Sequence, residues 1–426
     1  MFNLMAQGAA MLSQPDVIIA LIAGTLGGMF IGAMPGLSAS MAVALLIPVT
    51  FGMSGEAGIT LLTAVYTSAI YGGSITACLL HTPGSAATAA DGFALTKQGK
   101  GLKAIGVSTV ASMIGGTISA IALLFIAPAL SQVALKFSSL EYFLIGVFGL
   151  TIIGSLAGDN MMKGLLSGCL GLMIGCIGLD IQSSAPRYCF GILELQSGIQ
   201  LVPAMIGLFS LSQVMFSIED VAKGKHTVLD ENAKNLTGSP VPTWKEFKPL
   251  IPTIAQSSII GVLVGILPGA GGDIGSWISY NTAKNSSKHP EEFGHGSLVG
   301  IAASETANNA VTGGALIPLL TLGIPGSGVA AIMLGGLMIK GLTPGYKLFS
   351  DPTTGPIVYC IILAFALANV LMGVAGLGIC KQVVKISTIP MTILAPMIVA
   401  LSTVGSYAVR QSIFDVWVML VFGFIG

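Results

Sequence analysis

The stretch GGMFIGAMPGLSAS, residues 27–40, breaks an apolar run with proline, glycine and serine. Its pattern Gly-x-x-x-Gly-x-x-Pro-Gly, residues 28–36, returns unchanged at residues 261–269. Proline lacks a backbone donor and glycine has no single preferred region of φ and ψ, so each copy should interrupt the helix that its apolar neighbours favour. We therefore expect broken hydrophobic segments at corresponding positions of two repeated halves.

A second pair of patterns follows in the same order. Gly72-Gly73 leads to Pro83-Gly84-Ser85, and Gly313-Gly314 leads to Pro325-Gly326-Ser327. The halves are predicted as residues 1–218 and 249–426, joined by a polar linker at 219–248 that holds five lysines, four of them after residue 223. Matching broken segments in two halves of a membrane protein indicate the binding site of a transporter, and we expect the halves to have inverted topology.

Composition places the chain in the lipid bilayer. Hydrophobic residues make up 53% of it and charged residues 8%, and the mean hydropathy is +0.88. The stretches 17–55, 104–135 and 352–380 carry no charged side chain, and each exceeds the roughly 20 residues that cross the hydrocarbon core. We predict an all-α integral membrane protein with about ten to twelve membrane segments, some of them half-helices or re-entrant. A net charge of zero excludes nucleic acid as an expected partner.

The four Pro-Gly interruptions predict an anion site. A half-helix that begins after Pro-Gly presents free N–H groups at the positive end of its dipole, and a nearby serine adds a hydroxyl. We therefore expect the substrate to contact Pro35, Gly36, Leu37, Ser38, Pro83, Gly84, Ser85, Pro268, Gly269, Gly271, Pro325, Gly326 and Ser327. The alternative is that these serines only cap helices.

A polar run inside an apolar segment, residues 304–309, predicts the site of cation coupling. Glu305 is at helical spacing from Asn308 and Asn309, and ionisable groups at membrane depth are functional candidates. Alignment of the two Gly-Gly pairs places Thr67 and Ser68 opposite the two asparagines. Oxygen ligands suit Na⁺, whereas a lone carboxylate suits H⁺, and the sequence leaves both open. A structural hydrogen-bond network between helices is the alternative.

The remaining polar residues give weaker signals. We expect interfacial positions for five of them, Asp91, Asp159, Asp180, Arg187 and Glu194. Asp273 is of more interest because it lies in the second broken phrase, and His81 precedes the first Pro-Gly-Ser. The sequence contains no Ser-His-Asp set, zinc-binding helix, Walker loop or redox Cys-x-x-Cys. We expect no enzyme activity and no cofactor beyond the coupling ion, Na⁺ or H⁺.

Several of these motifs resemble the large membrane subunit of tripartite tricarboxylate transporters, the TctA family. The similar stretches include residues 32–40, 70–75, 81–85, 267–271, 287–294, 305–310, 313–327 and 414–417. The family usually has asparagine where His81 stands, and its members normally continue beyond Gly426, so one or two terminal spans are expected to be missing here.

The resemblance implies an ion-gradient-driven importer of citrate-like di- and tricarboxylates in the bacterial inner membrane. Its implied partners are a small membrane subunit and a periplasmic solute-binding protein. A transporter that works alone, without a binding protein, is the main alternative. An intramembrane enzyme would instead need a titratable pair facing one cavity, and a channel would show downhill flux without ion coupling.

Overall fold

The computed structural model describes residues 2–34, 36–82, 85–138, 140–141, 143–144, 146–148, 161–180, 182–223, 238–386 and 391–426. Four residues singled out in the sequence, Pro35, Pro83, Gly84 and Asp159, lie outside the described residues, as does 224–237 of the predicted linker. The domain boundaries at 218 and 248 therefore stay a prediction.

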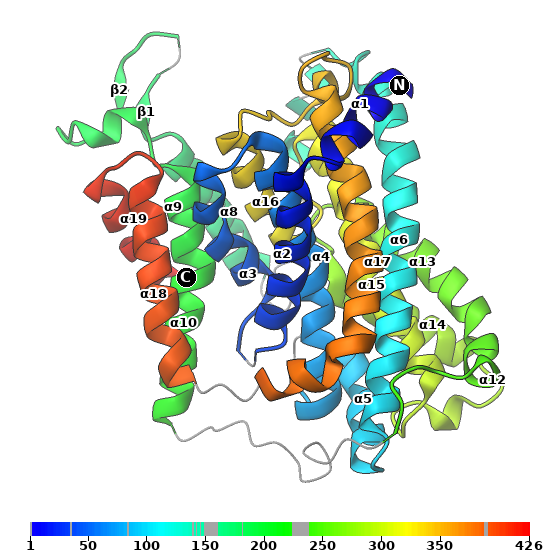
Figure 1. Ribbon diagram of the computed structural model, residues 1–426. Helices are drawn as coiled ribbons and strands as arrows, with labels where there is room; N and C mark the ends of the chain where they lie inside the picture. Colours follow the sequence, from blue (N-terminus) through cyan, green and yellow to red (C-terminus); the bar gives the residue numbers. More distant parts are fainter. Residues whose placement is uncertain are drawn as a thin grey trace.

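The chain is almost entirely helical, as predicted (Figure 1). The helices of the first 134 residues are α1 (Phe2–Leu12), α2 (Pro15–Gly32), α3 (Ala39–Leu46), the 3₁₀ helix η1 (Pro48–Gly52), α4 (Gly55–Leu80), α5 (Ala86–Lys97) and α6 (Gly101–Ala134). They are followed by α8 (Met161–Gly175), a two-stranded antiparallel hairpin of β1 (Gly178–Leu179) and β2 (Pro186–Arg187), η3 (Glu194–Ser197), α9 (Leu201–Met205), the π-helical η4 (Ile206–Leu211) and α10 (Ser212–Ala222).

The second part of the chain repeats the alternation of long and short helices. Its elements are α12 (Trp244–Phe247), η5 (Lys248–Leu250), α13 (Ile251–Ile266), α14 (Gly271–Ser286), η6 (Pro290–Glu292), α15 (Leu298–Leu322), α16 (Gly328–Ile339), η7 (Tyr346–Phe349), α17 (Gly355–Ile386), α18 (Met391–Ala408) and α19 (Ile413–Ile425).

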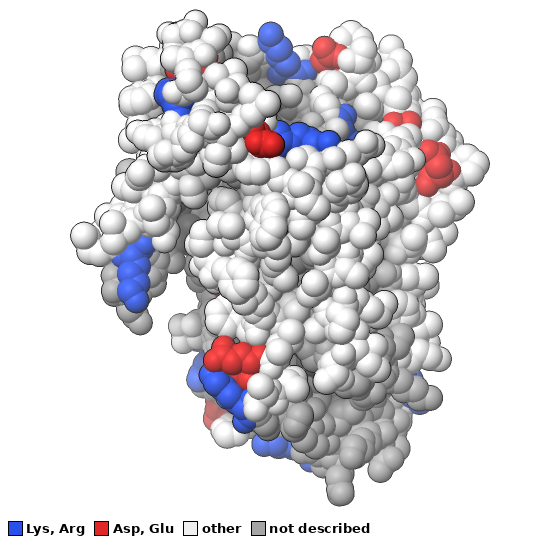
Figure 2. All heavy atoms as spheres, turned by 90° about the vertical axis from the view of Figure 1, so that its left-hand side faces the viewer, with Lys and Arg blue, Asp and Glu red and all other residues white. Residues whose placement is uncertain are grey.

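Six helical segments of the described chain are long and apolar enough to cross a membrane, and five shorter apolar helices accompany them. Figure 2 shows charged side chains gathered mainly toward the two ends of the molecule, with a largely uncharged surface between them. This distribution is that of a multi-pass membrane protein, because charged side chains are costly in hydrocarbon and favour the interfaces.

Helices α4 and α15 form the centre of the molecule and are buried along nearly their whole lengths. Glycines bring their neighbours close. A Cβ on Gly28 of α2 would lie 2.7 Å from the Val65 carbonyl oxygen, and one on Gly261 of α13 would lie 2.5 Å from that of Ala307. The Gly-x-x-x-Gly part of the repeated phrase is therefore the surface by which α2 packs on α4 and α13 packs on α15, because only small residues allow such close backbone approach.

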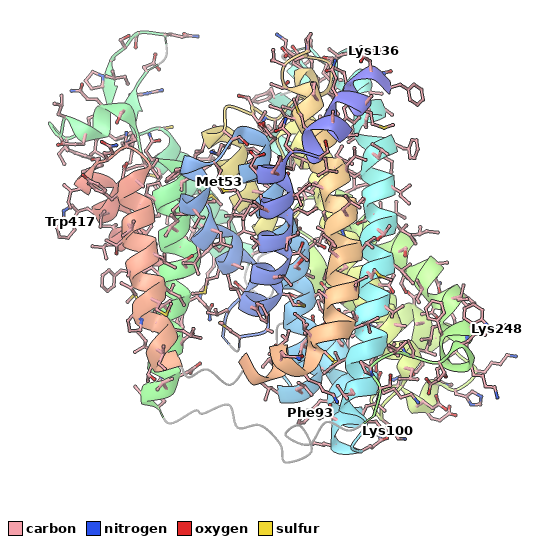
Figure 3. The ribbon with its side chains drawn as sticks, in the orientation of Figure 1. Met53, Phe93, Lys100, Lys136, Lys248 and Trp417 are labelled. Atoms are coloured by element: carbon pink, nitrogen blue, oxygen red, sulfur yellow. The ribbon has the colours of Figure 1, made fainter. Side chains whose placement is uncertain are left out.

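The two central helices run in opposite directions. Helix α4 starts after Met53, in the upper part of Figure 3, and leads down to α5, which contains Phe93. The backbone N–H of Ser297, just before α15, donates to Asp91 of α5, so α15 starts at that lower end. The chain from α15 through α16 reaches the upper end, because Lys340, which follows α16, donates to the Met53 carbonyl oxygen.

Candidate substrate cavity and buried polar network

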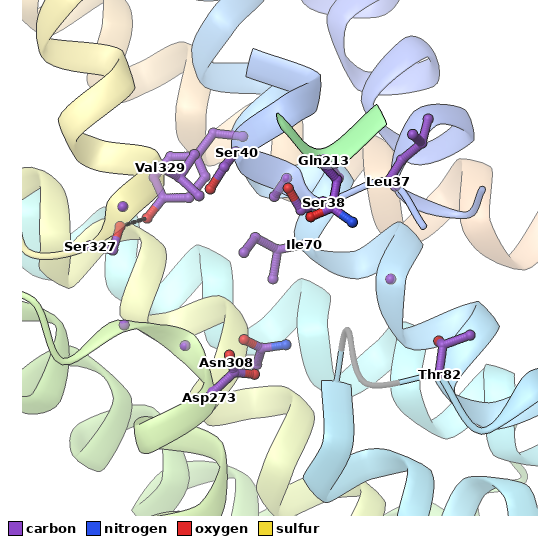
Figure 4. A pocket seen from close by; sticks show the side chains of 18 of the residues that line it. Leu37, Ser38, Ser40, Ile70, Thr82, Gln213, Asp273, Asn308, Ser327 and Val329 are labelled. Carbon is purple, nitrogen blue, oxygen red and sulfur yellow. Dashed lines mark hydrogen bonds between the residues drawn. The ribbon is translucent and has the colours of Figure 1, made fainter. Parts of the chain in front are cut away.

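Elements from both parts of the chain enclose a cavity of about 600 Å³ beside α4 and α15. Small-molecule pockets span roughly 300–1,000 Å³, so this volume suits a compact solute. Figure 4 shows its labelled side chains converging from several helices. The lining residues with polar or ionisable side chains are Ser38, Ser40, Tyr66, Thr76, Thr82, Gln213, Ser217, Asp220, Asp273, Asn308, Thr312 and Ser327.

Helix starts from opposite ends of the sequence face this cavity. Ser38 caps α3 by accepting a hydrogen bond from the Met41 N–H at 3.2 Å, and Ser327 caps α16 by accepting one from the Ala330 N–H at 3.1 Å. Both serines line the cavity, as does Gly271 at the start of α14. The described lining contains no Lys, Arg or His, so backbone N–H groups, hydroxyls and the side-chain amides of Gln213 and Asn308 are the donors available to an anion there.

The predicted substrate residues divide into two groups. Gly36, Leu37, Ser38, Gly271 and Ser327 line the cavity, whereas Ser85, Pro268, Gly269, Pro325 and Gly326 are not part of its lining. The glycines of the second group have backbone roles. Gly269 has φ +77°, a left-handed conformation that side chains rarely adopt, and a Cβ on Gly326 would lie 2.3 Å from the Gly265 carbonyl oxygen.

Each Pro-Gly-Ser serine is hydrogen-bonded to the central helix of the opposite half. The Asn308 side chain of α15 donates its amide N–H to Ser85 Oγ at 3.0 Å. The Tyr66 hydroxyl of α4 lies 3.0 Å from Ser327 Oγ, and Figure 4 marks this contact. Since Tyr66 and Asn308 both line the cavity, these bonds connect its wall to the two broken segments.

Glu305 lies behind the cavity wall and is fully buried. Thr88 of α5 donates to its Oε1 at 2.5 Å, and Ser112 of α6 donates to its Oε2 at 2.9 Å. The hydrogen-bond partners of both oxygens are thus neutral hydroxyls. Ionic groups inside a membrane protein are rare and usually functional, and this carboxylate joins three helices at the core.

The other predicted coupling residues lie on α4 and α15. Asn309 and Thr67 are buried and adjacent, with the Thr67 hydroxyl 3.4 Å from Asn309 Oδ1. Ser68 is also buried, but it faces α2, where a Cβ on Gly28 would lie 3.2 Å from its Cβ. Only Asn308 of the predicted coupling set lines the cavity.

Sequence reasoning missed several polar residues of this region. Thr88, Ser112 and Asn369 are buried in the network, and Gln213 and Ser217 of α10 line the cavity. Asn369 carried a signal in the sequence, because it is the one amide side chain in the charge-free apolar stretch 352–380. Gln213 and Ser217 also had one, since they are four residues apart on one helix face.

Asp91, expected near an interface, lies beside the start of α15 but is enclosed by protein. Asp91 is fully buried, and its Oδ1 accepts hydrogen bonds from the N–H groups of Gly294, Gly296 and Ser297 at 2.8–2.9 Å. The Tyr280 hydroxyl donates to Oδ2 at 2.9 Å. These donors stabilise a buried carboxylate, which here fixes the start of α15 against α5.

His81 ends α4 in a left-handed conformation with φ +56°, and its ring packs against Phe93 at 5.1 Å. It is exposed and does not line the cavity, although the next residue, Thr82, does. Among the residues that the structure describes, no three His, Cys, Asp or Glu side chains gather as a metal site.

Two curated relatives match the chain. A protein of Agrobacterium vitis, described as an uncharacterized 52.8 kDa protein in the TAR-I ttuC′ 3′ region, is 35% identical over 415 residues, which are 97% of this chain and 81% of the relative. A second, an uncharacterized protein in the TAR-II ttuC′ 3′ region of the same organism, is 40% identical over 166 residues, or 39% of this chain and 68% of the relative. No solved structure matches the chain.

The family comparison covers nearly the whole sequence. Residues 18–426 match the family described as Tripartite tricarboxylate transporter TctA family, in agreement with the motif resemblance. That family is one of transporters that work with other subunits of a tripartite system, and its match agrees with the apolar, multi-pass fold. The chain belongs to the TctA family of tripartite tricarboxylate transporters.

Proposed function

We propose that the chain is the permease subunit of an ion-gradient-driven, binding-protein-dependent importer of citrate-like di- and tricarboxylates. The observation that carries this proposal is the cavity in which the capped starts of α3 and α16 face one space. An anion near a helix N-terminus gains typically 0.3–1 kcal/mol, and up to about 2 kcal/mol where the site is partly buried. Two such ends suit a substrate with more than one carboxylate.

The proposed coupling region is the set Glu305, Asn308, Asn309, Thr67 and Ser68. Asn308 connects it to the substrate cavity, because its side chain lines the cavity and also bonds to Ser85. A cation bound beside Glu305 would compensate the buried negative charge. Occupation of this region would then favour the cavity geometry that accepts an anion, which is the linkage that symport requires.

The proposed architecture is an inverted repeat. It is supported by the opposite directions of α4 and α15, by the matching glycine contacts of α2 and α13, and by the reciprocal bonds of Ser85 and Ser327. In transporters of this kind one half rocks against the other around a central site. The small membrane subunit, the periplasmic binding protein and the inner-membrane location complete the proposal.

The test is counterflow of labelled substrate in proteoliposomes containing the purified permease and small subunit. A panel of mono-, di- and tricarboxylates is presented with a Na⁺ gradient or a pH gradient imposed separately. Exchange of di- or tricarboxylates that depends on one cation supports the proposal. Flux of none of them would refute it, and cation-independent downhill flux would indicate a channel.

A purified periplasmic binding protein from the same system separates the proposal from its main alternative. Uptake that requires this protein, loaded with substrate, supports a tripartite importer. Equal uptake without it would support a stand-alone carboxylate and cation transporter.

A further inference from the structure

A carboxylate stands in the wall of the cavity that is proposed to hold an anion. Asp273, in the first turn of α14, is exposed and lines the cavity. Among the described residues, no side chain or N–H group donates to this carboxylate or pairs with it. An ionised carboxylate accepts hydrogen bonds but cannot donate them, and it repels other carboxylates. Asp273 therefore faces a part of the substrate that is not a carboxylate.

Asn308 places a second acceptor beside Asp273. Its amide N–H donates to Ser85 Oγ, and its Oδ1 is on the side of α14, where a Cβ on Gly272 would lie 2.2 Å from it. Asn308 is 4% exposed and lines the cavity, and no described residue donates a hydrogen bond to its Oδ1. Figure 4 shows the side chains of Asp273 and Asn308 together on one side of the cavity. The side chains on this wall thus offer a solute two acceptors.

Side-chain donors lie elsewhere in the cavity, where α10 packs on the start of α3. Ser38 Oγ accepts the N–H that it caps, so its own proton is available to a solute. Gln213 adds an amide, and its helix is close to the same start, since a Cβ on Gly36 would lie 3.2 Å from Ser217 Oγ. Figure 4 shows Ser38 and Gln213 away from Asp273. A carboxylate of the substrate suits the donors, and a hydrogen-bond donor of the substrate suits the acceptors.

Asp220 is the other carboxylate of the described lining, and it has a cation near it. Lys223 follows it three residues later on α10, pairs with Glu219 and also interacts with the charge of Asp220. No such cation accompanies Asp273 among the described residues. Asp273 is therefore the carboxylate of the lining whose charge is left for the solute.

We propose that Asp273 is a specificity-determining residue that accepts a hydrogen bond from a hydroxyl group of the substrate, with Asn308 Oδ1 beside it. The substrate class is then a hydroxylated di- or tricarboxylate, whose carboxylates bind at the starts of α3 and α16 and whose hydroxyl faces α14. Because a first-turn carboxylate offsets the positive end of its helix, the start of α14 suits a neutral donor better than an anion. This inference rests on the proposed function and deepens it by naming the substrate class.

The test is equilibrium binding of two matched pairs of acids to the purified protein, measured by isothermal titration at constant pH and Na⁺. Citrate and propane-1,2,3-tricarboxylate differ by one hydroxyl, as do malate and succinate. A hydrogen bond to a charged group changes affinity by roughly 10- to 100-fold, and we expect the hydroxylated acid of a pair to bind more tightly by about this factor.

Asp273→Ala should bring the two affinities of a pair close together, because it removes both the acceptor for the hydroxyl and the repulsion of the acid that lacks one. Asp273→Asn keeps the shape of the side chain and decides the case if the alanine variant does not fold. It should also lower the ratio, since an amide is a weaker acceptor and can donate to a carboxylate.

Asp16→Asn is the matched control. Asp16 is likewise a first-turn carboxylate, of α2, but it accepts a hydrogen bond from Ser54 and lies outside the cavity lining. The control should keep the wild-type ratio. If Asp273 only stabilised the start of α14, its substitution would change all four affinities by one factor and leave the ratio within each pair as it was.

Equal wild-type affinities within both pairs would overturn the inference, as would a wild-type ratio in a folded Asp273→Ala or Asp273→Asn protein. Either result leaves a carboxylate transporter standing, because the acids still bind. Binding of none of the four acids, combined with no carboxylate flux in proteoliposomes, would instead refute the proposed function and this inference with it.

Discussion

The two Pro-Gly-Ser segments occupy corresponding places but have different surroundings. Ser327 caps α16, contacts Tyr66 and lines the cavity. Ser85 precedes α5, makes no capping bond, accepts a hydrogen bond from Asn308 and lies outside the lining. Both segments thus lead into a short helix, but only Ser327 of the two serines lines the cavity.

The buried carboxyl group of Glu305 likewise has no counterpart at the corresponding position of the other half. Glu305 contacts Thr88 of α5, but alignment of the Gly-Gly and Pro-Gly-Ser motifs puts Ala64 and Ala330 at the corresponding positions of the other half. We infer a division of roles in which α16 presents its N-terminus to the substrate and α5 contacts the coupling carboxylate. In the proposed inverted repeat, substrate and coupling cation would then act on different halves.

The largest expected effect tests what the halves share. Gly36→Val and Gly269→Val should each abolish uptake, because both glycines have left-handed φ values, +84° and +77°, at the broken phrases. A β-branched residue in that conformation is strained by about 1–3 kcal/mol and would displace the helix starts that face the cavity. The measurement is uptake by proteoliposomes, with membrane insertion and monodispersity as the control. Normal uptake by either inserted variant would contradict equivalent roles for the two breaks.

A smaller effect is expected where the halves differ. Glu305→Gln should change the cation concentration for half-maximal uptake by roughly 5- to 150-fold, the usual range of a coupling free energy. The amide keeps the shape of the side chain but loses the charge that attracts a cation. Asn308→Ala and Asn309→Ala should raise the same requirement by less.

Asp351→Asn is the matched control for this measurement. Asp351 is exposed and accepts hydrogen bonds from the N–H groups of Thr353 and Thr354, so its substitution also removes one carboxylate. It should leave the cation requirement at the wild-type value. Unchanged cation dependence in Glu305→Gln as well would place the coupling charge elsewhere.

Cysteine accessibility sharpens the comparison further. In a background without the six native cysteines, cysteines at Ser38 and Ser327 should react with a small thiol reagent, and substrate should slow both reactions. Cysteine at Ser85 should react far more slowly, because this residue, unlike Ser327, lies outside the cavity lining. Protection at only one of the first two positions would show that one half alone holds the substrate. Rapid, substrate-protected labelling at Ser85 would instead make the two serines equivalent.

The features that could be predicted from sequence are local or repeated ones. The breaks at Gly36 and Gly269 follow from the backbone preferences of proline and glycine, and composition alone predicts the membrane fold. The repeat of Gly28 and Gly32 at Gly261 and Gly265 also marked two helix surfaces that pack closely. These signals need no knowledge of which segments meet in space.

Partners that meet across the repeat could not be predicted in this way. Glu305 was identifiable as an unusual charge, but its partners Thr88 and Ser112 are ordinary residues that matter only because α5 and α6 cross α15 there. The burial of Asp91 could not be predicted for the same reason, since the donors that compensate it lie about 200 residues away in the sequence. Exclusion of Ser85 from the cavity likewise depends on tertiary packing.

The smallest expected effect concerns two corresponding side chains, Lys340 and Gln98, each of which connects the end of a short helix to the loop before the opposite central helix. After α16, the Lys340 ammonium donates to the carbonyl oxygens of Thr50 and Met53 at 2.5 and 2.8 Å. After α5, the Gln98 amide donates to the His295 carbonyl oxygen at 2.9 Å.

The two donors occupy corresponding places, thirteen residues after Ser327 and Ser85, but they differ in charge and exposure. Hydrogen bonds of a charged donor contribute about 1.5–3 kcal/mol, whereas a neutral one contributes about 0.5–1.5 kcal/mol and less when exposed. Lys340→Met should therefore lower the free energy of unfolding clearly more than Gln98→Met, measured by thermal unfolding of the purified protein. Equal losses would mean that the charge at Lys340 adds nothing, and the asymmetry between the halves would then be confined to the surroundings of Ser85 and Ser327.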